Sequence, residues 1–274
     1  GARLARRVRA HCRARRLLRV AARRSRARAA GGSPGRPRPR RSTGTAGVAP
    51  VAASRFLARG GDVLLAPGPL YPNTPFQLCH TGLLLGCHVV LAERFDAADT
   101  LASIGRHRAD VVSLVPTMLL RMLRVLEDDP GAYDLSSLRV LWHMAAPCPP
   151  WLKHAWMALV GPEKVWELYG GTELISVTTI DGPTWLERPG SVGRPLFGAM
   201  VVLDDDGCEV PRGEMGEIYM RPADGPTFTY VGAEARTSGE WTSLGDLGRM
   251  DDDGYLYLSD RRTDLVLAGG QNIY

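Results

Sequence analysis

Short apolar runs alternate with longer helix-like segments through residues 62–170. Five runs predict buried strands: 62–66, 88–92, 110–115, 138–144 and 164–170. The segments between them predict four helices: 75–86, 98–108, 116–129 and 151–161. In the third helix Pro116 stands in the first turn, where proline is tolerated, and the following apolar positions recur at helical spacing. Such alternation of strand and helix is typical of an α/β fold with a parallel sheet covered by helices.

The pattern changes after about Gly190. Three strand-like pieces follow, at 199–204, 216–221 and 254–260, and Gly/Asp/Pro-rich turns separate them. These pieces predict β-ribbons or a small barrel-like subdomain appended to the parallel sheet. No long linker or internal repeat separates the α/β pattern from the β-rich pattern.

Charge divides the chain further. The 274 residues have a formal net charge of +5, yet residues 1–41 hold 16 arginines and no acidic residue. The rest of the chain has 18 basic and 29 acidic residues, a net charge of −11. We therefore expect three regions: an Arg-rich, disordered or non-native arm over 1–41, an α/β subdomain over 42–190, and a β-rich subdomain over 191–274.

The Arg-rich arm allows several interpretations. Arginine blocks bind polyanions, which would favour a non-catalytic anion- or nucleic-acid-binding protein. An Arg-rich start is also typical of transit peptides, although these carry more serine than the single Ser25 found here. Because the chain has 32 arginines and two lysines, a wrong start or shifted frame in a GC-rich gene explains the arm equally simply. We do not expect nucleic acid as a partner and derive the function from the rest of the chain.

Two further compositional features exclude classes of protein. No apolar stretch approaches the roughly 18–20 residues of a membrane-spanning helix. The five cysteines are scattered without a C-x-x-C pair, which argues against a zinc site or a disulfide framework and for a reducing, cytoplasmic location. We expect Cys148, between two prolines, to be a structural thiol and not a nucleophile.

The segment WELYGGTE (166–173) carries the clearest chemistry. Tyr169 leaves an apolar strand and can stack on a flat ring, while Gly170 and Gly171 allow close backbone approach. The Thr172 hydroxyl can bond a phosphate oxygen, and Glu173 beside phosphates suits a magnesium ligand. Gly-Gly-Thr also forms ordinary turns, and Glu173 could instead be the N-terminal charge of a helix.

A second cluster lies downstream. Asp246 follows a glycine in a predicted turn, where its carboxylate can accept both hydroxyls of a ribose. Arg261 follows a predicted strand fifteen residues later and can reach the same sugar or a phosphate. The alternatives are a turn aspartate and a solvated arginine.

Eight segments together resemble the adenylate-forming superfamily, which comprises acyl- and aryl-CoA synthetases, luciferases and peptide-synthetase adenylation domains. In chain order they are PGPLYPNTPF (67–76), SLVPTML (113–119), WHMAAPCPPWLK (142–153), YGGTE (169–173), GRPLFG (193–198), GEMGEIYM (213–220), SLGD (243–246) and DGYLYLSDRRTDLVLAGGQNIY (253–274). The resemblance covers roughly residues 31–274 and is nearest to acyl-CoA synthetases, including bile-acid-type ligases. It implies a partial large domain of the adenylate-forming fold, with the small C-terminal domain absent.

The resemblance implies roles for the residues that match its motifs. Tyr169 would stack on adenine with Gly170 and Gly171 beside it, and Thr172 would contact the α-phosphate. Glu173 would hold Mg²⁺ and, with Thr172, form the catalytic pair.

The resemblance extends to residues outside this segment. Asp246 would bind the ribose and Arg261 the nucleotide. Ala145, Ala146 and His143 would lie along the adenine and acyl wall, although we expect His143 to be a hydrogen-bonded strand histidine. Asp264 would be the hinge.

The implied reaction needs ATP, Mg²⁺ and coenzyme A. A small-molecule carboxylic acid attacks the α-phosphate, giving acyl-AMP and pyrophosphate, and coenzyme A then takes the acyl group. An adenylation domain of another adenylate-forming type remains an alternative.

The chain departs from the family pattern at the phosphate loop. GGSPGRPR (31–38) is the preferred match and makes Ser33, Gly35 and Arg38 nucleotide-binding candidates, with Pro34 where the family has Thr. STGTAGVAP (42–50) is the alternative. Pro72 also replaces the His of P-L-Y-H-N. The resemblance implies an incomplete synthetase, and because proline removes an N–H donor from an anion-binding loop, we expect its catalysis to be impaired.

Overall fold

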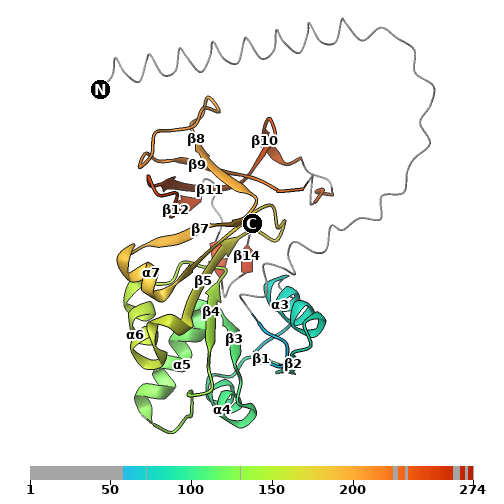
Figure 1. Ribbon diagram of the computed structural model, residues 1–274, viewed down its shortest axis with the longest axis vertical. Coiled ribbons are helices and arrows are strands. Elements are labelled where there is room, and N and C mark those ends of the chain that lie inside the picture. Colours follow the sequence, from blue (N-terminus) through green and yellow to red (C-terminus); the bar gives the residue numbers. More distant parts are fainter. Residues whose placement is uncertain are drawn as a thin grey trace, which may run out of the picture.

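Five parallel strands form one end of a twelve-stranded sheet, in the order β2-β1-β3-β4-β5 (Figure 1). They are β1 (Val63–Ala66), β2 (His88–Leu91), β3 (Val111–Leu114), β4 (Val140–Met144) and β5 (Val165–Gly170). Each strand lies inside one of the five apolar runs, so the predicted parallel sheet is confirmed. The computed structural model describes residues 58–71, 73–129, 131–224, 228–231, 234–261, 266–268 and 271–273.

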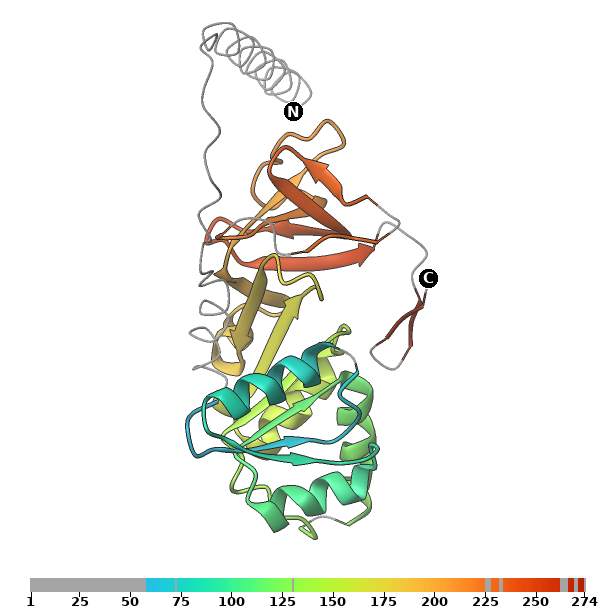
Figure 2. The same ribbon diagram turned by 90° about the vertical axis from the view of Figure 1, so that its right-hand side faces the viewer.

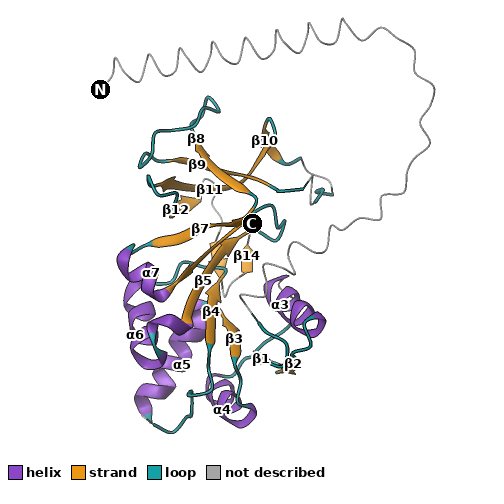
Figure 3. Cartoon of the chain, in the orientation of Figure 1, coloured by secondary structure: helices purple, strands orange, loops and turns teal. Residues whose placement is uncertain are grey.

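Helices cover both faces of this parallel part (Figure 3). They are α3 (Asn73–Leu84), α4 (Ala97–His107), α5 (Pro116–Asp128) and α6 (Pro150–Val160). Successive strand side chains point to opposite faces. Accordingly, Leu65 and Leu141 pack with α4, α5 and α6, whereas Leu64 and Trp142 pack with α3. The result is a three-layer arrangement with two apolar cores.

Local sequence explains where two of these helices begin. The Asp96 carboxylate caps α4 by accepting a hydrogen bond of 2.9 Å from the Asp99 backbone N–H. Pro116 is the first residue of α5, as predicted. The apolar stripe of α5 is buried and comprises Leu119, Met122, Leu123 and Leu126. Helical spacing in the sequence therefore identified the face that packs on the sheet.

The remaining strands continue the same sheet in antiparallel fashion, in the order β6-β7-β12-β11-β9-β8 with β10 on β11 (Figure 2). They are β6 (Val177–Asp181), β7 (Ser191–Phe197), β8 (Ala199–Leu203), β9 (Gly216–Arg221), β10 (Arg236–Ser238), β11 (Trp241–Met250) and β12 (Leu256–Arg261). A short helix α7 (Gly182–Glu187) joins β6 to β7, and β13 (Val266–Ala268) pairs with β14 (Gln271–Ile273). The sequence pattern located β8, β9 and β12 but missed β6, β7 and β11.

Strands β6 and β7 join the two parts, and Gly193 sits in this joint. It has φ +95°, and a Cβ there would lie 2.0 Å from the Thr179 carbonyl oxygen. Gly190 has φ +85° with no atom within 4 Å of such a Cβ. Both glycines have a left-handed backbone conformation that strains a residue with a side chain. Only at Gly193 would an added Cβ also clash with neighbouring atoms.

Gly193→Ala should therefore destabilise the protein more than Gly190→Ala. The shared left-handed conformation costs about 1–2 kcal/mol with alanine, and the clash at Gly193 adds about 1–3 kcal/mol. Chemical denaturation of both variants measures the difference. Equal midpoints would contradict the tight packing of β7 on β6.

Several sequence predictions fall outside the described residues. These are the Arg-rich arm, both candidate phosphate loops with Ser33, Gly35 and Arg38, Pro72, and the hinge candidate Asp264. Within the described parts, no helix combines the length and apolar character that crossing a membrane requires.

Candidate functional site

Tyr169 and Asp246 meet although 77 residues separate them in sequence. Tyr169 lies near the carboxyl end of β5, and its hydroxyl donates a 2.7 Å hydrogen bond to Asp246 Oδ2 on β11. Asp246 is buried, with 6% of its surface exposed. The contact bridges the parallel and antiparallel parts of the sheet, so the two residue clusters predicted separately form one site.

Asp246 and Arg261 occupy strands, and this corrects the predicted turn. Asp246 lies within β11 and directly follows Gly245, which has φ +83°. The register of β11 against β12 shifts between Asp246 and Gly248, so a bulge takes the place of the turn. Arg261 is the last residue of β12 and the cross-strand partner of Asp246. The antiparallel pairing thus brings the backbones of both candidates together.

The glycines of GGTE serve the packing of the chain itself. A Cβ on Gly170 would lie 2.6 Å from Val177 Cγ1, and one on Gly171 would lie 2.3 Å from Leu244 Cδ1. The close approach that glycine permits is therefore made to β6 and β11. The predicted backbone approach to a ligand stays a prediction.

Glu173 and Thr172 lie in the turn that follows β5 and precedes β6. Thr172 is exposed, and Glu173 Oε1 accepts a 2.6 Å hydrogen bond from the Tyr230 hydroxyl. No helix starts at Glu173, which excludes the helix N-terminal charge as its role. Sequence reasoning missed Tyr230, which lies 57 residues away without a motif around it.

A single carboxylate in this position suits a shared magnesium ion. Mg²⁺ is commonly held by one or two carboxylates together with substrate phosphates and water. Among the described residues there is no group of three or more His, Cys, Asp or Glu side chains that could hold a metal by itself. Glu173 therefore fits a magnesium ion that arrives with phosphates.

Ala145 and Ala146 follow β4 on the neighbouring loop. Met144 pairs with Leu168, so Ala145 lies beside Tyr169 in the register of the parallel strands. Ala145 has φ +69°, a left-handed conformation that is uncommon for a residue with a Cβ. Strained backbone of this kind concentrates at functional sites, which supports Ala145 as a candidate.

A buried polar cluster lies behind these loops. Lys153 Nζ on α6 is 2.6 Å from Glu167 Oε2 on β5, and His143 Nε2 on β4 is 4.0 Å from the same oxygen. Burial lowers the pKa of Lys153 and raises the pKa of Glu167, while their mutual attraction opposes both shifts. Sequence reasoning missed this pair because nothing in the spacing of the two residues links them.

His143 departs from its predicted hydrogen-bonded state. It lies in β4 and is fully buried, as expected of a strand histidine. In the described part of the chain neither ring nitrogen has a hydrogen-bond partner. Burial, together with the charge of Lys153, lowers the pKa of His143 to about 3. The ring is therefore neutral at physiological pH, because protonation would place an unpaired charge in the core.

Cys148 is not a nucleophile, as predicted. Burial, with the nearby Glu167 carboxylate, raises the pKa of Cys148 to about 12, so its thiol is not a nucleophile at neutral pH. Cys79, Cys87 and Cys148 are free thiols.

A small pocket lies next to the Tyr169 loop, at the carboxyl ends of β1, β3 and β4. It has a volume of about 110 Å³, and its lining includes Leu78, Leu114, Met118, Met144 and Ala145. Open parallel sheets bind ligands beyond the carboxyl ends of their strands. The pocket therefore stands where an α/β sheet places its ligand.

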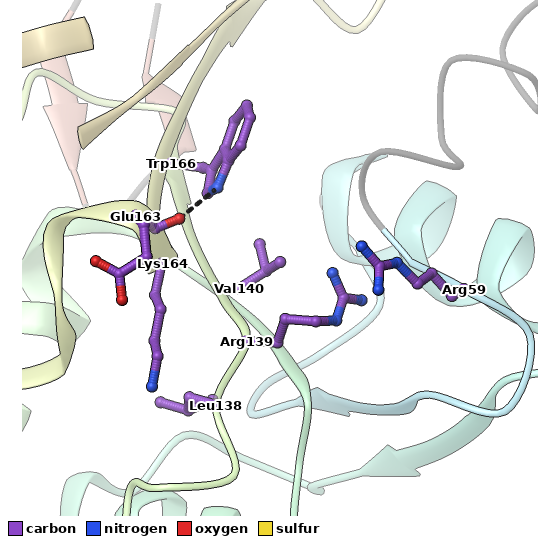
Figure 4. Close-up of a pocket in the computed structure, with 7 residues that line it drawn as sticks. All are labelled: Arg59, Leu138, Arg139, Val140, Glu163, Lys164 and Trp166. Carbon is purple, nitrogen blue, oxygen red and sulfur yellow. Dashed lines mark hydrogen bonds between the residues drawn. The ribbon is translucent and has the colours of Figure 1, made fainter. Parts of the chain in front are cut away.

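A larger hollow of about 460 Å³ opens at the opposite edge of the parallel sheet (Figure 4). It lies at the amino ends of β4 and β5, where Arg59, Arg139 and Trp166 line it. Arg139 forms an ion pair with Asp62, and the Trp166 indole donates to the Glu163 carbonyl oxygen at 3.3 Å. The candidate residues that the structure describes do not line this hollow, so its size does not make it the candidate site.

Comparison with known proteins connects this geometry to a family. A family model described as "AMP-binding enzyme" matches residues 40–228. The 2-succinylbenzoate–CoA ligase of Bacillus licheniformis is 36% identical over 213 residues, covering 75% of this chain and 42% of that protein. The same ligase from Bacillus subtilis is 33% identical, with equal coverage. The chain spans less than half the length of these curated relatives.

Solved structures share the fold. The amide bond synthetase McbA from Marinactinospora thermotolerans superposes with a TM-score of 0.70 at 29% identity, covering 89% of this chain and 54% of that one. The o-succinylbenzoate coenzyme A synthetase from Bacillus subtilis, solved in complex with ATP and magnesium ion, has a TM-score of 0.66 at 31% identity, covering 83% and 47%. Since the family model also matches more than half of the chain, the protein belongs to the AMP-binding enzymes of the adenylate-forming superfamily.

Proposed function

We propose that the protein takes part in the ATP-dependent activation of a carboxylic acid to acyl-AMP, followed by transfer of the acyl group to coenzyme A. The observation that carries the proposal is the Tyr169–Asp246 contact of 2.7 Å. It joins a candidate adenine platform and a candidate ribose acceptor at the carboxyl ends of parallel strands. The two named curated relatives, at 36% and 33% identity, are CoA ligases, which supports this reaction class.

Each candidate residue has a role in this reaction. The Tyr169 ring stacks on adenine, while its hydroxyl orients the Asp246 carboxylate toward the ribose. The backbone of the GGTE turn and the Thr172 hydroxyl lie toward the α-phosphate, where hydrogen-bond donors stabilise the charge that develops as the carboxylate attacks. Ala145 and Ala146 form the wall beside the adenine. Arg261, paired in register with Asp246, contributes positive charge near the nucleotide.

Glu173 would hold Mg²⁺ together with the ATP phosphates. The ion supplies neutralisation of phosphate charge, and the Tyr230 hydrogen bond keeps Glu173 oriented for this task. A related solved structure with ATP and magnesium ion supports the pairing of these two cofactors.

We further propose that acyl-AMP formation is slower than in related ligases. Pro72 replaces a family histidine, and Pro34 interrupts the preferred phosphate loop over 31–38. A proline in the phosphate loop removes one N–H donor for phosphate. A rate of CoA thioester formation equal to that of a related ligase would contradict this proposal.

Nucleotide binding tests the proposed function directly. Asp246→Ala in the 274-residue chain should raise the Kd of ATP with Mg²⁺ at least about tenfold, because the ribose loses a charged acceptor. Tyr169→Phe keeps the stacking ring and should have a smaller effect. Isothermal titration calorimetry measures both.

Asp252→Ala is the matched control. Asp252 is an exposed aspartate in the turn between β11 and β12, away from Tyr169, and its loss should leave ATP affinity unchanged. Equal affinity of wild type, Asp246→Ala and Asp252→Ala would overturn the nucleotide site.

A further inference from the structure

The small pocket described above lies one strand away from the proposed nucleotide site. Ala145 lines it and follows Met144, whose parallel-strand partner Leu168 directly precedes Tyr169. An acyl group joined to the α-phosphate of a nucleotide on Tyr169 therefore has this pocket beside it. Of the two hollows described above, this one borders both the Ala145 loop and the carboxyl ends of the parallel strands.

We infer that this pocket holds the acyl part of the substrate and selects small, apolar monocarboxylic acids, whose acyl part is no larger than about a benzene ring. The inference rests on the proposed function and names its substrate class. It distinguishes this chain from the named relatives, whose substrate 2-succinylbenzoate carries two carboxylates.

The first support is the chemistry of the lining. Among the lining residues that the structure describes, none has a charged side chain. The polar atoms include the Ser113 hydroxyl, which contacts Met144 Sδ at 3.8 Å, and the Thr74 hydroxyl. A second carboxylate seated here would lose its water without meeting a cation, which is strongly unfavourable. The pocket therefore disfavours dicarboxylic acids.

The second support is its size. The volume of about 110 Å³ is of the same order as the roughly 150 Å³ of an apolar cavity that binds benzene, so the pocket has room for about one such ring and not for a longer chain. Pro67, Pro69 and Pro75 line the pocket and fix their own backbone angles, which limits expansion of that wall. Leu114 and Met144 are buried under packed helices. A long acyl chain would have to displace this core.

Non-hydrolysable acyl-adenylate mimics test the inference without requiring turnover. The probes are 5′-O-sulfamoyl adenosine and its butyryl, benzoyl, succinyl and dodecanoyl derivatives, titrated into the 274-residue chain by calorimetry. Butyryl and succinyl form a matched pair, since both have four carbons and only succinyl ends in a carboxylate. The butyryl and benzoyl probes should bind at least tenfold tighter than the parent, whereas succinyl and dodecanoyl should show no such gain.

Variants in the pocket give the result a second readout. Thr74→Lys places a cation at the half-buried lining of α3 and should raise the affinity of the succinyl probe at least tenfold. Gln77→Lys on the same helix does not face the pocket lining and is the control. Met118→Trp should abolish the butyryl gain by filling the pocket, with the exposed Thr117→Trp as its control. If Met118→Trp fails to fold, the comparison of Thr74→Lys with Gln77→Lys still tests the inference.

The two levels of the proposal fail differently. If the parent adenosine probe does not bind, or binds equally to Asp246→Ala, the proposed nucleotide site fails. If the parent binds in an Asp246-dependent manner but the succinyl or dodecanoyl probe binds as tightly as butyryl, only the substrate class is overturned. If Thr74→Lys does not raise the affinity of the succinyl probe, the assignment of this pocket is likewise overturned.

Discussion

Replacing Lys153 with methionine should lower the free energy of unfolding by about 3–5 kcal/mol. Lys153 is 1% exposed, and its ammonium group is 2.6 Å from Glu167 Oε2 in the core beneath the Tyr169 strand. Methionine keeps much of the side-chain volume and removes the positive charge. The Glu167 carboxylate is then left buried without its partner, and it must either take up a proton or remain charged in an apolar setting.

Lys164 provides a matched control, since it is the only other lysine in the chain. It is half-buried at the amino end of β5, outside any ion pair among the described residues. Lys164→Met should change stability by less than about 0.5 kcal/mol. The double variant Lys153→Met with Glu167→Leu should recover most of the lost stability, because it removes both charges. Urea denaturation measures all three, and a Lys153 effect no larger than the Lys164 effect would refute the buried pair.

Lowering the pH should destabilise the protein through His143. Its pKa in the folded protein is about 3, against an ordinary value of 6.5, so the unfolded chain binds the proton more tightly between these values. The stability contribution is complete above pH 6.5 and is lost as the pH falls toward 3. Well inside this window the loss approaches about 1.4 kcal/mol per pH unit.

A comparison of variants isolates this effect from other titrating groups. His143→Leu should flatten the dependence of unfolding free energy on pH between about 6.5 and 4.5, because leucine carries no proton in either state. His154→Leu, at an exposed position of α6, should leave the slope unchanged. Parallel pH profiles of wild type and His143→Leu would contradict the buried neutral histidine.

Both predictions concern the buried polar cluster that lies behind the candidate site. His143 precedes Ala145 by two residues on β4, and Glu167 precedes Tyr169 by two residues on β5. Lys153 ties α6 to Glu167, and His143 pairs with Glu167 in the strand register. The buried polar cluster therefore lies just before the ends of two neighbouring strands, where the candidate adenine wall and platform begin.

The parallel part of the fold was predictable from sequence because each of its strands and helices has a hydrophobic pattern within its own residues. A strand buried on both faces reads as a continuous apolar run, and the apolar positions of α5 recur at helical spacing. Strands β7 and β11 escaped prediction for a physical reason. They contain glycines at 193, 245 and 248, which interrupt any apolar run or alternation, and their stability comes from pairing with partners distant in sequence.

At the candidate site, too, local motifs were predictable from sequence and contacts between distant residues were not. Sequence by itself determined that the chain belongs with adenylate-forming enzymes and named Tyr169, Glu173 and Asp246, because those motifs are local strings whose order is fixed by the chain. Only the tertiary structure decided that Tyr169 bonds Asp246, that Tyr230 bonds Glu173, and that Asp246 lies in a bulged strand. These contacts join residues 57–77 positions apart. Such pairs form only when the antiparallel strands close against the parallel ones, and no local pattern of residues records that closure.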